Sequence, residues 1–251
     1  MGQFKGEGIV LRSMNLGEWD KLLTVFTQGQ GRLKIVAKGA RKIQSRYASL
    51  TQLFCNIRFT VYQGKSVHTF SQVELIEGFR PLREDLGRMA YGIYMLEMID
   101  ATLEEGQSHD DILSLLIACL HILSHTDHLE LLLAFYELRL LSRLGWGLSL
   151  ESCPVCGGKM GAKFSIQNLG FPCSACIPGG AGEKPLLTIS LAAYSLLKTL
   201  CGGDWRRLEA LPTGIPGEKE VAAVLDRIIY IKLEKRLESY VFLSQIRSTA
   251  R

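Results

Sequence analysis

The first 80 residues of the chain alternate between hydrophobic and polar positions in short runs. Five runs of strand length are rich in Val, Ile, Phe and Thr and are separated by turn signals: GIVLRS, KLLTVFTQ, GRLKIVAK, QLFCNIRFTVYQ and SVHTFSQVEL. In the fourth run Ile57, Phe59 and Val61 fall on one face of the strand. Phe54, Arg58 and Tyr62 fall on the opposite face. This pattern predicts a small five-stranded barrel such as an OB-fold.

From residue 81 onward the hydrophobic positions recur with the period of a helix. The predicted helices cover residues 82–105, 110–124, 127–144, 188–200 and 218–239. We therefore expect an α+β multidomain chain, with an OB-fold domain at 1–80 and a helical domain at 81–251. The stretch GGAGEKP at 179–185 resembles a phosphate loop only weakly, because its glycine spacing is wrong, and we interpret it as a linker.

Two Cys-x-x-Cys pairs interrupt the helical pattern, in a module at about 150–180. They comprise Cys153, Cys156, Cys173 and Cys176, with sixteen residues between the pairs. Two residues between thiols let a tight turn direct both sulfurs at one ion, at about 2.3 Å for zinc. The spacing therefore predicts one structural zinc per chain, in a closed site that activates no water.

Redox chemistry and disulfides are the alternatives for these pairs. A redox Cys-x-x-Cys opens a helix after a strand, and neither pair has that context. The remaining cysteines, Cys55, Cys119 and Cys201, stand in apolar surroundings and are expected to pack as small hydrophobes. The first residues lack the apolar core of a signal peptide, so we expect a cytoplasmic protein, in which disulfides are disfavoured.

The basic residues are distributed unevenly. The formal net charge is only +4, but residues 1–80 carry twelve basic and five acidic side chains. Between Lys21 and Val73 there are nine basic residues and no Asp or Glu. Such asymmetry is typical of a domain that binds polyanions. Phe54, Tyr62 and Phe70 could stack on bases or could cover a neighbouring domain.

No arrangement of residues in the sequence is typical of an active site. There is no paired-carboxylate, Ser/His/Asp or HExxH pattern. His121, His125 and His128 lie three or four residues apart, and such histidines more often line a helix end than bind a metal. We therefore expect a binding protein and not an enzyme.

Three stretches resemble the RecO family of bacterial DNA repair and recombination proteins. They are NLGEWDKLLTVFTQGQGRLKIVAKGARKIQSRYASLTQ, VYQGKSVHTFSQVEL, and AFYELRLLSRLGWG leading into CPVCGG. They occur in the order of the family, and the resemblance extends over nearly the whole chain. One departure is Leu148, where the family often has Pro before the first cysteine pair. We expect this to change a local loop only.

The resemblance implies a non-catalytic DNA repair protein of the RecF recombination pathway, associated with the nucleoid. Such proteins bind single- and double-stranded DNA, anneal strands coated with single-strand-binding protein, and work with RecR to assist RecA loading. The resemblance also implies that the acidic C-terminal tail of single-strand-binding protein docks on the helical domain, for which Arg139 is a candidate contact. Together with the charge distribution, it predicts phosphate contacts by Arg12, Lys21, Arg32, Lys34, Lys38, Arg41, Lys42 and Arg46.

Residues 38–47, KGARKIQSRY, contain four of these cations and are expected to form a loop between the third and fourth strands. Two other classes of protein fit parts of the sequence. One is a zinc-ribbon transcription or translation factor that binds RNA. The other is a nuclease or ligase that holds its substrate on a basic barrel, and the missing carboxylate cluster disfavours it.

Overall fold

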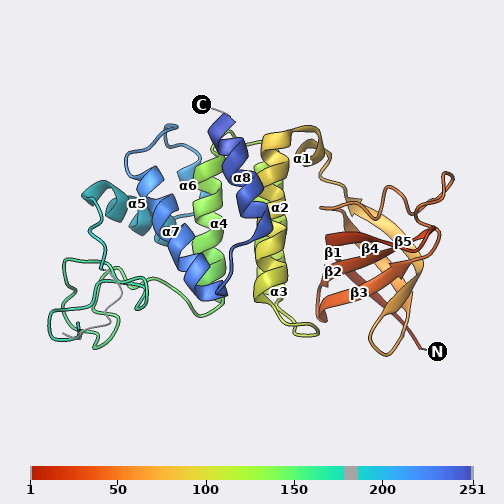
Figure 1. Ribbon diagram of the computed structural model, residues 1–251, viewed down its shortest axis with the longest axis horizontal. Coiled ribbons are helices and arrows are strands. Elements are labelled where there is room, and N and C mark those ends of the chain that lie inside the picture. Colours follow the sequence, from red (N-terminus) through yellow and green to blue (C-terminus); the bar gives the residue numbers. More distant parts are fainter. Residues whose placement is uncertain (1, 178–185, 250–251) are drawn as a thin grey trace. The chain divides into compact units, whose positions relative to one another are not determined.

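The alternating runs form five strands in the computed structural model, which describes residues 2–177 and 186–249. The predicted linker at 179–185 thus lies outside the described residues. The strands are β1 (Gln3–Leu16), β2 (Asp20–Thr27), β3 (Gly31–Ala37), β4 (Asn56–Tyr62) and β5 (His68–Glu77). They close into one barrel in the order β1-β2-β3-β5-β4, as Figure 1 shows.

Strand β1 is long enough to serve two neighbours. Its first half pairs with β4 and its second half with β2, and the register with β2 shifts between Val10 and Arg12. A bulge of this kind bends a strand so that it can turn a barrel corner. The barrel closes through a short parallel pairing of β3 with β5. This is the arrangement of an OB-fold, and the predicted fold class is confirmed.

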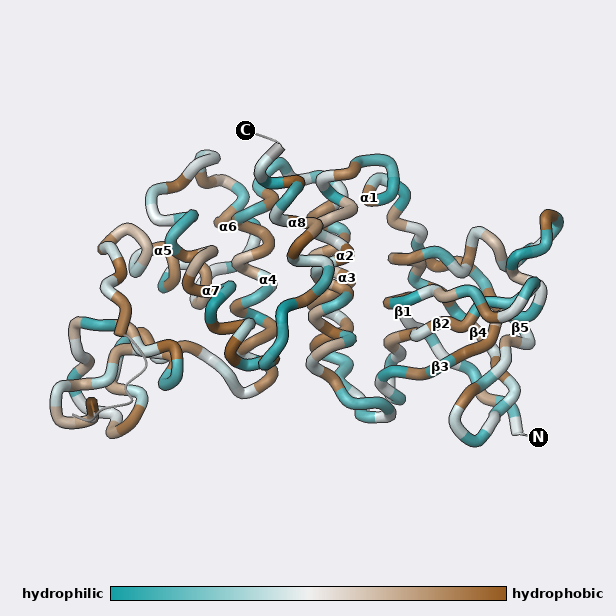
Figure 2. The backbone as a smooth tube through the Cα atoms, viewed as in Figure 1, coloured by the Kyte–Doolittle hydropathy of each residue, from teal (hydrophilic) through white to brown (hydrophobic). Residues whose placement is uncertain are grey.

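The barrel core consists of the side chains on the inner face of each strand. In β4 the residues Ile57, Phe59 and Val61 are buried, and Arg58 between them is exposed. In Figure 2 the colour accordingly alternates between hydrophobic and hydrophilic along the strands, whereas the helices carry longer hydrophobic stretches. The core also contains Val10, Leu23, Val25, Ile35, Ala37, Ala40, Cys55 and Phe70.

The contacts divide the chain into two units, Met1–His125 with Leu237–Arg251, and Thr126–Arg236. A division into domains at residue 80 stays a prediction. The first unit holds the barrel and helices α1 (Arg80–Glu84), α2 (Leu86–Thr102), α3 (Asp110–Leu123) and α8 (Glu238–Thr249). Within it, α2 packs against α1, α3, α8 and β1.

The second unit holds α4 (Leu129–Arg143), α5 (Leu191–Gly202), α6 (Trp205–Leu208) and α7 (Glu218–Leu233). Helix α4 packs against the other three. It reads LELLLAFYELRLLSR and is buried along most of its length. None of the helices in the described ranges has the length and apolar character needed to cross a bilayer.

Two predicted helices are interrupted in the structure. The expected helix at 82–105 divides at Asp85, whose backbone is extended and whose side chain accepts a hydrogen bond from the Arg88 N–H at 2.8 Å. An Asp in this role starts a new helix, because it satisfies one of the free N–H groups of the first turn. The expected helix at 218–239 ends at Leu233, because Glu234 adopts the left-handed conformation with φ 55°.

Candidate metal centre and nucleic-acid interface

Each cysteine pair forms a tight backbone turn. In the first pair the N–H of Gly157 donates to the carbonyl of Cys153 at 2.9 Å, and the Cys153 N–H donates to Gly158. Gly157 has φ 73°, a left-handed value that glycine adopts without strain. In the second pair the N–H groups of Cys176 and Ile177 both donate to the carbonyl of Cys173. Both turns therefore direct two thiols to the same side.

The four sulfurs meet at one point. The Sγ atoms of Cys153, Cys156, Cys173 and Cys176 all lie within 4.8 Å of one another, and those of Cys156 and Cys173 are 3.8 Å apart. Four sulfurs at about 2.3 Å from a central zinc would be separated by roughly 3.8 Å, so the cluster has the dimensions of a tetrahedral site. The predicted four-cysteine module in the helical region is confirmed.

The protonation of these thiols shows why the cluster suits a cation. The N–H of Cys173 donates to the Cys153 sulfur at 3.3 Å, and together with the Cys156 N–H it lowers the pKa of Cys153 to about 6. Hydrogen bonds with the sulfurs of Cys156 and Cys173 raise the pKa of Cys176 to about 12. Backbone N–H groups thus favour the deprotonated form of Cys153. Four thiolates this close together can coexist only if a cation neutralises their charge. The donor set fits a thiophilic metal.

Around the cluster, the chain between α4 and α5 has a small aromatic core. The ring of Phe171 makes edge contacts with Phe164 and Tyr194, with centroids 5.4 and 5.6 Å apart. The Tyr194 hydroxyl donates to the Leu150 carbonyl at 2.8 Å. A Cβ atom on Gly161 would lie 2.1 Å from the Pro172 carbonyl oxygen, so only glycine fits there. A metal would join the two turns through all four thiols.

On the barrel, three of the predicted phosphate contacts are already paired with carboxylates. Arg32 and Arg12 bind the two oxygens of Asp100 in α2, at 2.5 and 3.1 Å. Lys34 binds Glu105 at 2.6 Å. The side chains of Arg32 and Asp100 are only 14% and 15% exposed, so Arg32 has little surface left for a phosphate. We call Arg12, Arg32 and Lys34 the anchored cations.

The turn between β2 and β3 strengthens the same attachment. The N–H of Gly29 donates to Asp110 at the start of α3, at 2.8 Å, and lowers the pKa of that carboxyl. Gly31 has φ 65°, and a Cβ atom there would lie 2.1 Å from the Gln107 carbonyl oxygen. The backbones therefore approach each other as closely as only glycine permits. This side of the barrel is held against α2 and α3.

The remaining predicted cations lie elsewhere. We call residues 38–46 the basic loop, and its Lys38, Arg41, Lys42 and Arg46 are all exposed. The segment follows β3 and contains no strand, as predicted. Within the described parts of the chain, none of these four is in an ion pair with a carboxylate. Lys21, at the start of β2, is half-buried.

Although the basic loop is irregular, its backbone is attached to the turn between β1 and β2. The Arg41 N–H donates to the Trp19 carbonyl at 2.9 Å, and its guanidinium donates to the Gly17 carbonyl at 2.6 Å. The Gly39 N–H donates to the Asp20 carboxylate at 2.7 Å. The cations that form no ion pair in the described residues therefore project from a loop whose backbone is hydrogen-bonded to this turn.

The predicted stacking rings divide into two groups. Phe54 is 1% exposed and Phe70 is 6% exposed, so neither offers a face to a base. Phe54 instead packs on α2, where its ring lies close to Gly92. Tyr62 is 43% exposed, and stacking by its ring stays a prediction. The sequence interpretation did not include Trp19, which is 54% exposed; an aromatic residue in the turn GEWD was the available signal.

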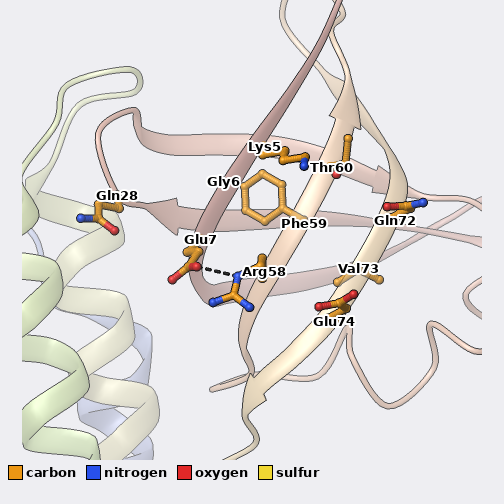
Figure 3. A pocket seen from close by; sticks show the side chains of 10 residues that line it. All are labelled: Lys5, Gly6, Glu7, Gln28, Arg58, Phe59, Thr60, Gln72, Val73 and Glu74. Atoms are coloured by element: carbon orange, nitrogen blue, oxygen red, sulfur yellow. Dashed lines mark hydrogen bonds and ion pairs between the residues drawn. The ribbon is translucent and has the colours of Figure 1, made fainter.

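A hollow of about 480 Å³ opens on another part of the barrel, where β1, β4 and β5 meet (Figure 3). Its lining includes Glu7 and Glu74. Its cations are Lys5 and Arg58, and Arg58 binds Glu7 at 2.6 Å. Carboxylates repel phosphates, so this hollow is less suited to a DNA backbone than the basic loop.

Arg139, the candidate tail contact, lies in α4. Its guanidinium donates to the carbonyl of Gly203 at the end of α5 and lies over the Phe135 ring, 5.1 Å from the centroid. The side chain is half-buried and held in one orientation. Binding of a partner tail there stays a prediction.

Taken together, a closed OB-type barrel, a helical region and a four-thiol cluster define a class of barrel protein with a metal-binding helical body. The comparisons with known proteins extend this description. The family described as Recombination protein O N terminal matches residues 1–79, and the one described as Recombination protein O C terminal matches residues 83–240. The chain belongs to the RecO family of DNA repair proteins.

Curated relatives match this chain over nearly its full length. The DNA repair protein RecO of Symbiobacterium thermophilum is 38% identical over 254 residues, which cover 99% of this chain and 99% of that protein. The DNA repair protein RecO of Desulforamulus reducens is 33% identical over 97% of this chain and 94% of its own length. The corresponding protein of Bacillus pumilus is also 33% identical, over 97% and 94%.

Proposed function

We propose that the chain is a non-catalytic mediator of the RecF recombination pathway. It binds single- and double-stranded DNA, anneals complementary strands coated with single-strand-binding protein, and assists RecA loading together with RecR. Membership of the RecO family supports a role in DNA repair. The observation that carries DNA binding is the basic loop, four exposed cations without carboxylate partners in the described residues.

Unpaired lysines and arginines bind phosphates by releasing the counterions of the DNA. Phosphates are the same in every sequence, so this contact is expected to be indifferent to base sequence and to weaken steeply with salt. A loop can follow an irregular single strand, because its cations are not confined to the plane of a sheet. The basic loop therefore suits single-stranded DNA in particular.

Annealing then requires no chemical step. Two complementary strands bound on one positive surface repel each other less than they do in solution. They also meet at a high effective concentration. The protein is left with the tasks of holding both strands and releasing the duplex.

The metal in this proposal is zinc, held by Cys153, Cys156, Cys173 and Cys176. With four thiolates the coordination sphere is closed, so the metal stabilises the fold and takes no part in a reaction. Zinc analysis of carefully prepared protein should give about one equivalent per chain. Less than half an equivalent would count against the site.

Arg139 is proposed to bind the acidic C-terminal tail of single-strand-binding protein. Its guanidinium has five N–H donors, and the contact with Gly203 orients the group while leaving donors for a carboxylate. A tail peptide should bind the wild-type protein and bind Arg139→Ala more weakly. Equal binding to both would remove Arg139 from this role.

The experiment that tests the function is annealing of complementary strands precoated with single-strand-binding protein. The chain should accelerate annealing, and RecR should increase RecA loading on the same coated strands. No acceleration would refute the mediator role. Competition between DNA and RNA strands of one sequence distinguishes an RNA-binding factor, and incubation of labelled DNA with magnesium distinguishes a nuclease.

A further inference from the structure

The turn between β1 and β2 carries exposed hydrophobic side chains next to the basic loop. Trp19 is 54% exposed, and on β1 the side chains of Met14 and Leu16 are 54% and 42% exposed. Exposing a Trp ring to water is unfavourable, and such rings are usually buried or used in binding. Nothing in the barrel core requires this ring, because Trp19 stands outside the core cluster.

Two cations of the basic loop, Lys42 and Arg41, contact this turn, in which Glu18 and Asp20 flank Trp19 in the chain. The Lys42 ammonium lies over the Trp19 ring, 6.0 Å from its centroid. Arg41 is tied to the same turn through its backbone and its guanidinium, which bind the carbonyls of Trp19 and Gly17 at 2.9 and 2.6 Å. The ring and two groups that can bind phosphates are therefore held on the same turn.

We propose that Trp19 is a stacking platform for an unpaired base of single-stranded DNA, while Lys42 and Arg41 bind the phosphates next to that base. This site rests on the proposed DNA-binding function. It adds a base contact by Trp19, which was not among the rings predicted from the sequence to stack on bases. Stacking on an aromatic ring is tolerant of sequence, because every base has a π-face. It distinguishes single strands from duplexes, in which the faces of the bases are already stacked.

Charge complementarity favours a nucleic acid over an apolar protein surface as the occupant. A hydrophobic partner would have to bury the charges of Lys42 and Arg41 together with the ring, and the surrounding cations would then lose their hydration without compensation. A nucleotide supplies an aromatic face and a negative charge together. The turn is short and its backbone is hydrogen-bonded, so little ordering is required on binding.

The experiment compares full-length Trp19→Ala, Trp19→Phe and wild type on two labelled strands of equal length. One strand is oligo(dT), and in the other the bases are missing. Trp19→Ala should weaken binding of oligo(dT) by roughly 5- to 100-fold, and Trp19→Phe should largely restore it, because a phenyl ring can still stack. Neither substitution should change the salt dependence, which reports phosphate contacts. Leu75→Ala, which removes a side chain that is 48% exposed elsewhere on the barrel, is the matched control.

The strand without bases gives the decisive outcome. Wild type should bind it more weakly than oligo(dT), and Trp19→Ala should reduce or abolish that difference. Quenching of Trp fluorescence by oligo(dT) should also be smaller in Trp19→Phe, a readout that does not need the Ala variant to fold. Equal losses on both strands, or no loss on either, would overturn the stacking site. Weaker binding of the acidic tail peptide with unchanged DNA affinity would assign the ring to a protein partner instead. If wild type binds neither strand, the proposed function itself fails.

Discussion

The anchored cations and the basic loop belong to the same barrel and the same run of basic residues, yet the fold uses them in different ways. Arg12, Arg32 and Lys34 project from strands and meet Asp100 and Glu105. The four cations of the basic loop project from an irregular segment and meet no carboxylate in the described residues. A count of charges along a sequence therefore overestimates the surface available to DNA, because some of the charges attach the barrel to its own helices.

The largest expected effect is on DNA affinity, when the basic loop is reversed in charge. Changing Lys38, Arg41, Lys42 and Arg46 to Glu should weaken binding of single-stranded DNA by about 100-fold or more near 100 mM salt. The dependence of log K on log salt should flatten by up to roughly 3, since each lost phosphate contact removes about 0.7. Fluorescence anisotropy of a labelled strand over about 50 to 200 mM salt measures both quantities.

The matched control carries the same change in net charge at exposed positions in the second unit: Arg206, Arg207, Lys219 and Lys235 to Glu. It should lose far less affinity. Zinc content and tail-peptide binding should survive in the loop variant, because the groups proposed for both lie in the second unit. A folded loop variant that still anneals at the wild-type rate would remove the basic loop from the mechanism.

Removing a metal ligand should affect stability strongly and leave the barrel able to bind. Cys153→Ser should abolish stoichiometric metal binding and lower the melting temperature, since a closed thiolate site contributes folding free energy directly. Cys55→Ser is the matched control, a buried thiol in the barrel core that donates to the Ser49 carbonyl at 3.3 Å. It should retain the metal. Metal analysis and thermal unfolding decide between the two, and equal metal content in both variants would contradict the site.

Breaking the ion pairs between the barrel and Asp100 should lower stability and leave DNA affinity nearly unchanged, the opposite of the basic-loop variant. Asp100→Asn leaves the nearly buried Arg32 without its counter-charge and should cost about 3 kcal/mol of unfolding free energy. Its affinity for DNA should stay within about twofold of wild type at moderate salt, because no phosphate contact is lost. Lys38→Gln should change affinity and not stability. Denaturant unfolding measures the stability of both variants, and fluorescence anisotropy measures their DNA affinity. If each variant changed both stability and affinity, the separation of anchored cations from DNA-binding cations would be refuted.

The smallest expected effect concerns acid stability at the anchored side. The Gly29 N–H lowers the pKa of Asp110, so the stabilisation is fully present above the ordinary Asp pKa of about 4 and is lost as the pH falls through the folded value. Asp110→Asn keeps a neutral acceptor and removes this titration. The difference in unfolding free energy between wild type and variant should therefore shrink on acidification. A difference that is constant from about pH 7 to pH 3 would contradict the assignment.

Local patterns were sufficient to predict the strands and the cysteine cluster. Alternation in residues 56–62 indicates which face of β4 is buried. The Cys-x-x-Cys spacing indicates two tight turns, each formed by residues that are adjacent in the chain. The break at Asp85 was missed because the same residue type also occurs inside helices. The pairing of Arg32 with Asp100 joins residues 68 positions apart, and no periodicity along the chain contains that information.

Phe54 illustrates the limit most clearly. Its position in the alternating pattern predicted an outward ring, but its backbone adopts φ 71° before β4 begins, which interrupts the alternation. The ring fills the space that Gly92 leaves open on α2. A glycine in a helix and an aromatic residue in a distant loop are each ambiguous, and only their contact in the fold explains both.

The double contact of Asp100 has a consequence for work with isolated fragments. A barrel truncated after β5 would lose the carboxylates of Asp100, Glu105 and Asp110, while residues 1–80 contain twelve basic and five acidic side chains. Arg12, Arg32 and Lys34 would then lose both their carboxylate partners and the helices that pack against this side of the barrel. Such a fragment should bind DNA through two faces, and its apparent site size and affinity would exceed those of the barrel within the full chain.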